Sequence, residues 1–172
     1  MFLLTAEDTA FHSGKYTFWD NVYEFNLSPM KQNVFIEPFV DLIDARLVGS
    51  NPCMIKDIDA EKVTVKDLDF SAPFSLSAIR DHECNCLVGY FDIPFDTKAP
   101  TPVSFCTGPA STNTHWKQTL FYLEKPVQLA KGESLEGTIE VKKNAGNARC
   151  LDISLTYGKA GEPKLSQSFE LA

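Results

Sequence analysis

The spacing of hydrophobic residues divides the chain into two parts, with a change near residue 37. In the first part, four large apolar residues recur at the one-and-four spacing that places side chains on one stripe of a helix. These residues are Phe18, Trp19, Val22 and Tyr23. Ser28 followed by Pro29 is typical of a helix start, because serine caps a first turn and proline fits its first position. We therefore predict short helices within residues 9–36, the second of them through 30–35.

From residue 37 onward, apolar and polar residues alternate with a period of two. The clearest segments are 135–142 and 151–157, where the alternation is that of a strand with one buried face. Turn signals separate many such short segments, which favours an antiparallel sandwich or barrel. The fold class that we predict is mainly β, with a short helical arm near the N-terminus. The further predicted strands are 38–43, 53–58, 62–66, 73–80, 84–93, 102–106, 115–123 and 165–171.

The length and composition of the chain are typical of a single globular domain. The 172 residues include 16 Lys and Arg against 23 Asp and Glu, which gives a net charge of -7. Such a charge argues against direct nucleic-acid binding, which needs clustered basic residues. No apolar run approaches the roughly 20 residues of a membrane helix, and the residues after Met1 lead us to expect no secretory signal. We expect no membrane partner and no nucleic-acid partner.

One stretch of the chain is strongly acidic. Residues 37–69 hold eight acidic side chains against four basic ones. Such a run attracts a basic peptide if its charges are free. It forms a solvated set of strand ends and turns if they are not. The sequence leaves both interpretations open.

Five cysteines give an odd number with no CxxC pair. The pattern indicates neither a complete disulfide framework nor a four-ligand zinc site, and we predict no metal. Cys84 and Cys86 are two apart in a predicted strand, so we expect both side chains on one buried face. Buried cysteines of this kind are typical of a protein in a reducing compartment. No two glycines lie two residues apart, which excludes a GxG phosphate loop.

The chain has only three histidines. His12 and His82 lie in predicted surface turns or loops. His115 follows a polar loop and opens a predicted strand, so its ring either faces a neighbouring cleft or packs on Trp116. No cysteine has the context of a nucleophile paired with it. The residues alone therefore define no catalytic constellation.

Four ordered strings carry a resemblance to a known family. They are residues 18–30 (FWDNVYEFNLSPM), 37–41 (EPFVD), 105–109 (FCTGP) and 114–119 (THWKQT). Together they closely resemble the C-terminal half of type I protein arginine N-methyltransferases, in order and over nearly the whole chain. The resemblance implies a substrate-binding and dimerisation part of an enzyme that transfers methyl from S-adenosylmethionine to protein arginine.

The resemblance also implies a division of the chain. Residues 1–8 match the strand that crosses from the methyltransferase domain, 9–36 match a helical dimerisation arm, and 37–172 match an antiparallel β-barrel. The domain that binds S-adenosylmethionine and supplies two catalytic glutamates has no counterpart here. We expect this chain to bind no cofactor and to be inactive alone.

The resemblance assigns roles position by position. His115 matches a loop histidine that pairs with an acidic residue of the methyltransferase domain, and it is the one catalytic residue implied. Thr114 and Trp116 join it in binding the substrate arginine. The arm residues implied to form a homodimer are Phe18, Trp19, Val22, Tyr23 and Phe25. An arm folded back on its own barrel is the alternative.

The expected substrates are arginine-rich proteins, including histones and proteins with arginine- and glycine-rich segments, in cytoplasm, nucleus or both. A free-standing β-barrel module that binds or regulates other proteins without catalysis is the alternative function. Two residues depart from the family pattern. Glu24 stands where glycine is usual, so a backbone with positive φ is replaced or strained there. Cys150 stands where aspartate is usual.

Overall fold

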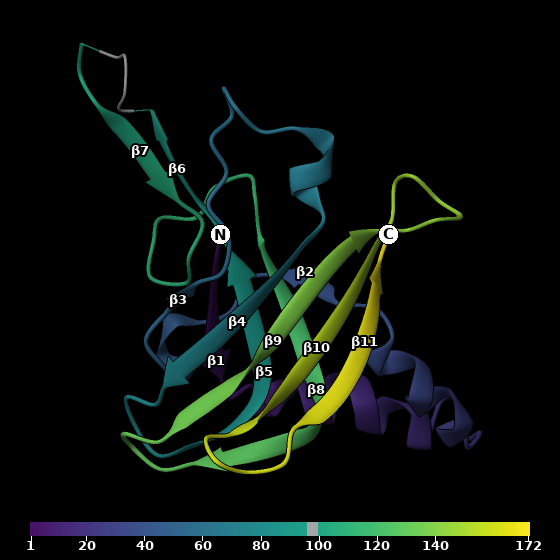
Figure 1. Ribbon diagram of the computed structural model, residues 1–172. Helices are drawn as coiled ribbons and strands as arrows, with labels where there is room; N and C mark the ends of the chain where they lie inside the picture. The colour runs from purple at the N-terminus through teal and green to yellow at the C-terminus, as the bar shows by residue number, and fades with distance from the viewer. Residues whose placement is uncertain (96–99) are drawn as a thin grey trace.

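The computed structural model describes residues 1–95 and 100–172, apart from the side chain of His12. Its strands pair only in antiparallel ladders, and the fold is mainly β (Figure 1). The strands are β1 Phe2–Ala6, β2 Phe39–Asp41, β3 Cys53–Met54, β4 Phe70–Ser77, β5 His82–Tyr90, β6 Asp92–Phe95, β7 Val103–Cys106, β8 Gln118–Leu129, β9 Ser134–Lys143, β10 Leu151–Lys159 and β11 Leu165–Leu171. The predicted strand 165–171 is confirmed with the same bounds.

Three sheets result from this pairing. A five-stranded sheet has the order β2-β8-β5-β1-β3, a four-stranded sheet has the order β11-β10-β9-β4, and β6 pairs with β7. The alternation predicted for 135–142 and 151–157 is confirmed, because β9 and β10 pair with Ile153 opposite Val141 and Leu155 opposite Ile139.

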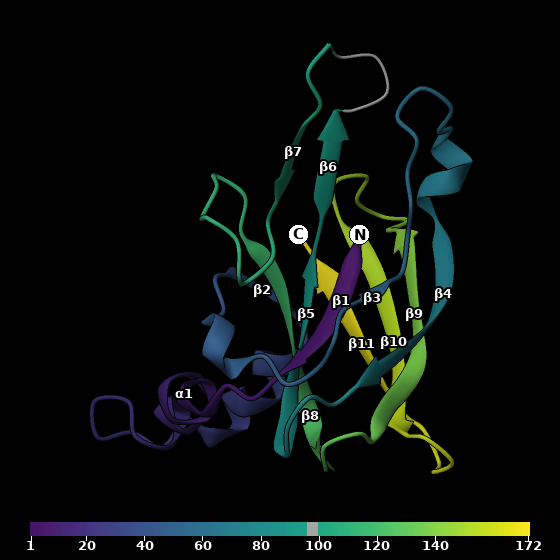
Figure 2. The ribbon, with the colours of Figure 1, turned by 90° about the vertical axis from the view of Figure 1, so that its left-hand side faces the viewer.

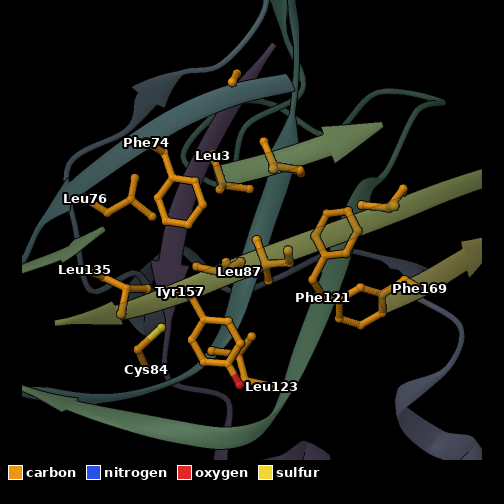
Figure 3. Close-up of a cluster of buried hydrophobic side chains, with 14 of the residues drawn as sticks. Leu3, Phe74, Leu76, Cys84, Leu87, Phe121, Leu123, Leu135, Tyr157 and Phe169 are labelled. Atoms are coloured by element: carbon orange, nitrogen blue, oxygen red, sulfur yellow. The ribbon is translucent and has the colours of Figure 1, made fainter. Parts of the chain in front are cut away.

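The main core lies between the two larger sheets (Figure 3). Leu3, Leu87 and Phe121 come from the five-stranded sheet, and Phe74 and Tyr157 from the four-stranded sheet. All five are at most 5% exposed, and full burial of such a side chain is worth about 1.5–3 kcal/mol. The two facing sheets and their shared core form the scaffold on which the loops and the arm are placed.

A closed barrel is not confirmed, because the ladders of the described residues form separate sheets. The sheets are joined at two edges instead. At one edge, Asn51 N donates to Ser77 O (3.0 Å) and Ile79 N donates to Gly49 O (2.9 Å). At the other, the buried amide of Gln167 accepts from Glu124 N (3.1 Å) and also donates to a carbonyl of β8. These links keep two open sheets face to face.

The segment between β3 and β4 departs from the prediction. The strand predicted at 53–58 shortens to Cys53–Met54. The strand predicted at 62–66 is wrong, because a 3₁₀ helix, η5, occupies Val65–Leu68. Thr64 and Asp67 form a capping box there, with Thr64 N donating to Asp67 Oδ2 at 2.8 Å. Capping of this kind stabilises a helical turn over an extended chain.

The prediction that Cys84 and Cys86 share one face is also wrong. Cys84 belongs to the core between the sheets, whereas Cys86 belongs to a second cluster that includes Val88. The register of β5 against β8 shifts between the two cysteines, and such a bulge changes the side on which a residue points. Both thiols are buried, as predicted.

His82 is not in a surface loop. It is the first residue of β5 and only 5% exposed. Its Nε2 lies 2.9 Å from Thr5 Oγ1 and its Nδ1 lies 3.0 Å from Arg80 O. A Cβ on Gly49 would lie 2.1 Å from the imidazole Nε2, so a glycine at that distant position makes room for the ring.

The arm, residues 9–36, is built from short helical turns rather than two helices. They are α1 Thr9–Phe11, the π turn η1 His12–Tyr16, and the 3₁₀ helices η2 Thr17–Asp20 and η3 Ser28–Phe35. A further 3₁₀ turn, η4, follows β2 at Ala45–Leu47. Leu27, not Ser28, is the residue at the N-cap of η3.

The predicted helical stripe is wrong beyond Trp19. Residues 21–27, which we call the arm tip, form no helix. Val22 and Phe25 instead exchange backbone hydrogen bonds of 2.9 and 3.0 Å. Tyr23 and Glu24 between them have φ of 52° and 72°, a left-handed conformation that reverses the chain.

Candidate functional site

The residues predicted to bind substrate lie in a loop between β7 and β8, residues 107–117, which we call the histidine loop. In Figure 2 this green loop lies beside the base of the β6–β7 hairpin. Trp116 stacks on Phe105 of β7, with ring centroids 5.4 Å apart and planes 14° apart. Phe91 meets the same indole edge-on at 6.3 Å. The three rings form a platform on which the loop rests.

A local turn places His115 at the exposed edge of this platform. Trp116 N donates to Thr114 Oγ1 (3.1 Å), and Thr114 Oγ1 donates to Trp116 O (3.0 Å). His115 between them is exposed, and its ring meets Trp116 edge-on at 5.9 Å. The imidazole thus contacts the indole and is open to solvent at the same time. His115 precedes β8 rather than opening it.

Both ends of the histidine loop are tied to the sheet. Thr107 N donates to Phe91 O (3.0 Å), and Thr107 Oγ1 accepts from Phe91 N (3.1 Å). Lys117 Nζ lies 2.9 Å from Asp41 Oδ1 on β2, and this hydrogen bond lowers the pKa of the Asp41 carboxyl. The buried amide of Gln118 links the same elements.

The base of the arm packs on its own sheet. The Phe11 ring stacks on Tyr122 of β8 at 3.4 Å, with planes 6° apart, and Phe39 meets both rings edge-on. Tyr122 Oη donates to Asp8 Oδ2 (2.6 Å). Burial raises the pKa of this tyrosine well above its usual value. The phenol therefore stays protonated and acts as a donor.

The outer part of the arm, η2 and the arm tip, carries exposed aromatic side chains. Phe18, Tyr23 and Phe25 are 51%, 92% and 70% exposed, whereas Trp19 and Val22 are half-buried. A hollow of about 400 Å³ lies beside Phe18 and Trp19. It is lined by Gly14, Lys15, Phe18, Trp19, Met30, Asn33, Val34 and Phe39. Large apolar surface of this kind marks an interaction site more often than a free surface.

The described residues outside the histidine loop and the arm include two buried cysteines whose thiols are not reactive. Burial raises the pKa of the Cys84 thiol to about 12 and also raises that of Cys86, so neither is a thiolate near neutral pH. Within the described ranges, no three His, Cys, Asp or Glu side chains gather as metal ligands would. The helices described are all too short or too polar to span a membrane.

Local partners account for much of the acidic run. Asp44 pairs with Arg46, which lowers the pKa of its carboxyl to about 2. Asp59 pairs with Lys62 at 2.7 Å, and Asp41 pairs with Lys117 as described above. Asp67 closes the capping box, and Asp69 Oδ1 accepts from a backbone amide. These contacts favour the interpretation as solvated turns.

The family is identified by comparison with known proteins. A family model described as the arginine methyltransferase oligomerization subdomain matches residues 1–162. The chain belongs to this family, which confirms the resemblance drawn from the four strings.

Protein arginine N-methyltransferase 1 of Schizosaccharomyces pombe is 43% identical over 155 residues, which cover 90% of this chain and 45% of that protein. The Chlamydomonas reinhardtii protein of the same description is 38% identical over 172 residues, covering 98% and 50%. The chain spans about half the length of the curated relatives that it matches.

Two solved structures have the same fold. The Trypanosoma brucei PRMT1 enzyme-prozyme heterotetrameric complex with AdoHcy matches with a TM-score of 0.92 and 31% identity, over 99% of this chain and 55% of that chain. Arabidopsis thaliana protein arginine methyltransferase 10 matches with a TM-score of 0.77 over 99% of this chain and 58% of that chain. Its identity of 16% shows the fold alone.

Sequence reasoning missed three parts of the site. The platform of Phe91 and Phe105 was not predicted, although the string 105–109 contains one of its rings. Gln118 lies within the string 114–119, but nothing nearby indicates its partners. The contact of Asp8 with Tyr122 joins residues more than a hundred positions apart, so it left no local signal.

Proposed function

We propose that this chain is the substrate-binding and dimerisation part of a protein arginine N-methyltransferase. The whole enzyme would transfer a methyl group from S-adenosylmethionine to arginine-rich proteins, including histones and proteins with arginine- and glycine-rich segments. One observation carries the proposal: the histidine loop presents an exposed His115 beside the stack of Trp116 on Phe105, in a chain of this family.

The chemistry of the loop suits an arginine side chain. A guanidinium is planar and cationic, and it stacks on aromatic faces. Trp116 supplies such a face next to an imidazole that can hold a proton. Histidine beside a carboxylate serves as a proton carrier in general acid–base catalysis, and the carboxylate would come from a methyltransferase domain outside this chain.

The residues of this chain do not suit the cofactor itself. S-adenosylmethionine supplies the methyl group, but no pair of the nine glycines has the spacing of a GxG nucleotide loop. We therefore assign cofactor binding to a domain outside this chain. The two facing sheets would act as the barrel-type scaffold, with β1 added to the strands of residues 37–172. Thr114, His115 and Trp116 would bind the substrate arginine, and His115 would also be the catalytic residue.

The test of this proposal is the variant His115→Ala in the complete enzyme. We expect turnover to fall by about 10²–10⁴-fold, the usual contribution of a positioned acid or base, while affinity for S-adenosylmethionine stays unchanged. Asn113→Ala, another exposed residue of the same loop, is the matched control. Turnover that is equal in the two variants would remove the role assigned to His115.

The arm is proposed to hold a homodimer together. Trp19→Ala combined with Tyr23→Ala should shift the complete enzyme towards monomer in analytical ultracentrifugation. Aromatic side chains dominate the energetics of interfaces, and Tyr23 is almost fully exposed. Val65→Ala is the control, because Val65 is 77% exposed but lies outside the arm. An unchanged sedimentation profile would refute the dimerisation role.

A second function remains as the alternative to the enzyme. A free-standing module that binds or regulates other proteins would use the same arm and loop without catalysis. The mass of the protein in its source cells separates the two: roughly twice 19.2 kDa fits an enzyme with a second domain of ordinary length. We further propose cytoplasm, nucleus or both as its location, on the basis of five cysteines without a disulfide.

A further inference from the structure

We propose that Gln118 is the positioning residue that holds the histidine loop in place, and its catalytic consequence rests on the function proposed above. The side chain of Gln118 is only 3% exposed. Its Nε2 donates to Thr107 O at 2.7 Å, and its Oε1 accepts from Ile43 N at 2.8 Å. One amide group therefore joins three chain segments: the end of β7, the start of β8 and the stretch after β2.

The bond to Thr107 closes the loop at its neck. Thr107 begins the loop and Gln118 directly follows its end, so their hydrogen bond brings the two ends of residues 108–117 together. Thr107 is itself 3% exposed and fixed to Phe91 through its backbone and its hydroxyl. The neck is thus tied to Phe91, which directly precedes β6 and belongs to the aromatic platform.

Only a side-chain amide fits this position. It offers a donor and an acceptor on one planar group, which the carbonyl of Thr107 and the N–H of Ile43 require. A carboxylate would keep the bond to Ile43 but turn a second oxygen towards the Thr107 carbonyl. An apolar side chain would leave two buried backbone groups without a partner, which proteins avoid.

The other restraints on the C-terminal end of the loop are weaker. The ion pair of Lys117 with Asp41 has side chains 47% and 66% exposed, and exposed pairs contribute little. Trp116 is 51% exposed despite its stack on Phe105. The buried amide is therefore the firmest attachment near His115. His115 and Gln118 are separated along the chain only by Trp116 and Lys117.

The first experiment uses this chain and needs no enzymatic activity. The background variant is Trp19→Phe, which leaves Trp116 as the only tryptophan, because the chain has two. Into it we would place Gln118→Met, which keeps the length of the side chain, and separately Gln118→Glu, which keeps the acceptor for Ile43 N but replaces the donor to Thr107 O by a carboxylate oxygen. We expect both to lose the near-ultraviolet circular dichroism of the stacked indole and to raise its quenching by acrylamide.

Gln167→Met is the matched control. Gln167 is also buried, at 8% exposure, and its amide also bridges backbone groups, with Nε2 donating to Tyr122 O at 3.0 Å. It lies at the edge between the two large sheets, away from the histidine loop. This variant should lose stability but keep the Trp116 signals. Unchanged signals in folded Gln118→Glu, or the same loss in Gln167→Met, would overturn the proposal.

The second experiment measures kinetics in the complete enzyme. Misplacing a reacting group by 1 Å can cost about 10²-fold in rate, so Gln118→Glu should lower kcat by up to about a hundredfold with the KM for S-adenosylmethionine unchanged. Gln167→Met should keep kcat. A wild-type enzyme without methylation would refute the proposed function and leave the tryptophan result standing. A normal kcat in Gln118→Glu, alongside a low one in His115→Ala, would refute only the positioning role.

Discussion

Replacing Glu24 by glycine should stabilise the arm tip. Tyr23 and Glu24 form a two-residue connection with positive φ at both positions, 52° and 72°, as in a type I′ hairpin turn. The flanking residues Val22 and Phe25 exchange both of their backbone hydrogen bonds across it. Residues with a Cβ adopt this conformation at a cost of roughly 1–2 kcal/mol each.

The size of the effect follows from two opposing terms. Glycine at position 24 removes one such cost, roughly 1–2 kcal/mol. It also gives the open chain more freedom, which takes back about 0.4–1 kcal/mol. The net gain is about 0.5–1 kcal/mol in the free energy of opening the turn, or about a 2–5-fold change in the opening equilibrium.

Native-state hydrogen exchange measures this equilibrium directly, because local opening differs from global unfolding. The amides of Val22 and Phe25 should exchange about 2–5-fold more slowly in Glu24→Gly than in the wild type. Glu24→Ala is the control, since it removes the carboxylate but keeps the Cβ. Equal protection in the glycine and alanine variants would show that the charge, not the backbone, sets the stability of the turn.

Two further predictions concern the body of the fold. Gly137→Ala should lower the free energy of unfolding by about 2 kcal/mol, in the range for overpacking, because the new Cβ would lie 1.8 Å from Thr156 O in the neighbouring strand; a urea midpoint equal to the wild type would contradict this. The hydrogen bond from Arg80 lowers the pKa of the Glu7 carboxyl below its ordinary value of 4.5. The ionised carboxylate therefore stabilises the fold fully above pH 4.5, and this stabilisation is lost as pH falls through the lower pKa of the folded state. The melting temperature of Glu7→Gln should therefore fall below that of the wild type at pH 7, and the difference should close in acid; a constant difference would count against the pair.

The β-rich half of the chain could be predicted well because its signal is local. Strict alternation predicts strands at 135–142 and 151–157, and the structure has Ser134–Lys143 and Leu151–Lys159. One buried face is enough to fix both the conformation and the phase of such a strand. The bulge that separates the faces of Cys84 and Cys86 arises from pairing with β8, which no alternation records.

The arm and the candidate site were less predictable because tertiary contacts shape them. The spacing of Phe18, Trp19, Val22 and Tyr23 fits a helix, but η2 ends at Asp20. The chain then reverses at Tyr23 and Glu24. The resemblance identified His115 and Trp116, yet their setting depends on Phe105 and on an amide bond to Thr107. Such contacts join separate segments and leave no periodic pattern.

The stack of Phe11 on Tyr122 makes the arm part of the body as well as a projection from it. Phe11 belongs to the buried cluster on the second face of the five-stranded sheet, together with Val88 and Leu120, and Val34 and Phe35 pack against that cluster. Excising residues 9–36 to obtain a monomer would strip this face and leave an aggregation-prone protein. A well-behaved monomer must instead be made by point changes at the arm tip, which leave the cover of the sheet intact.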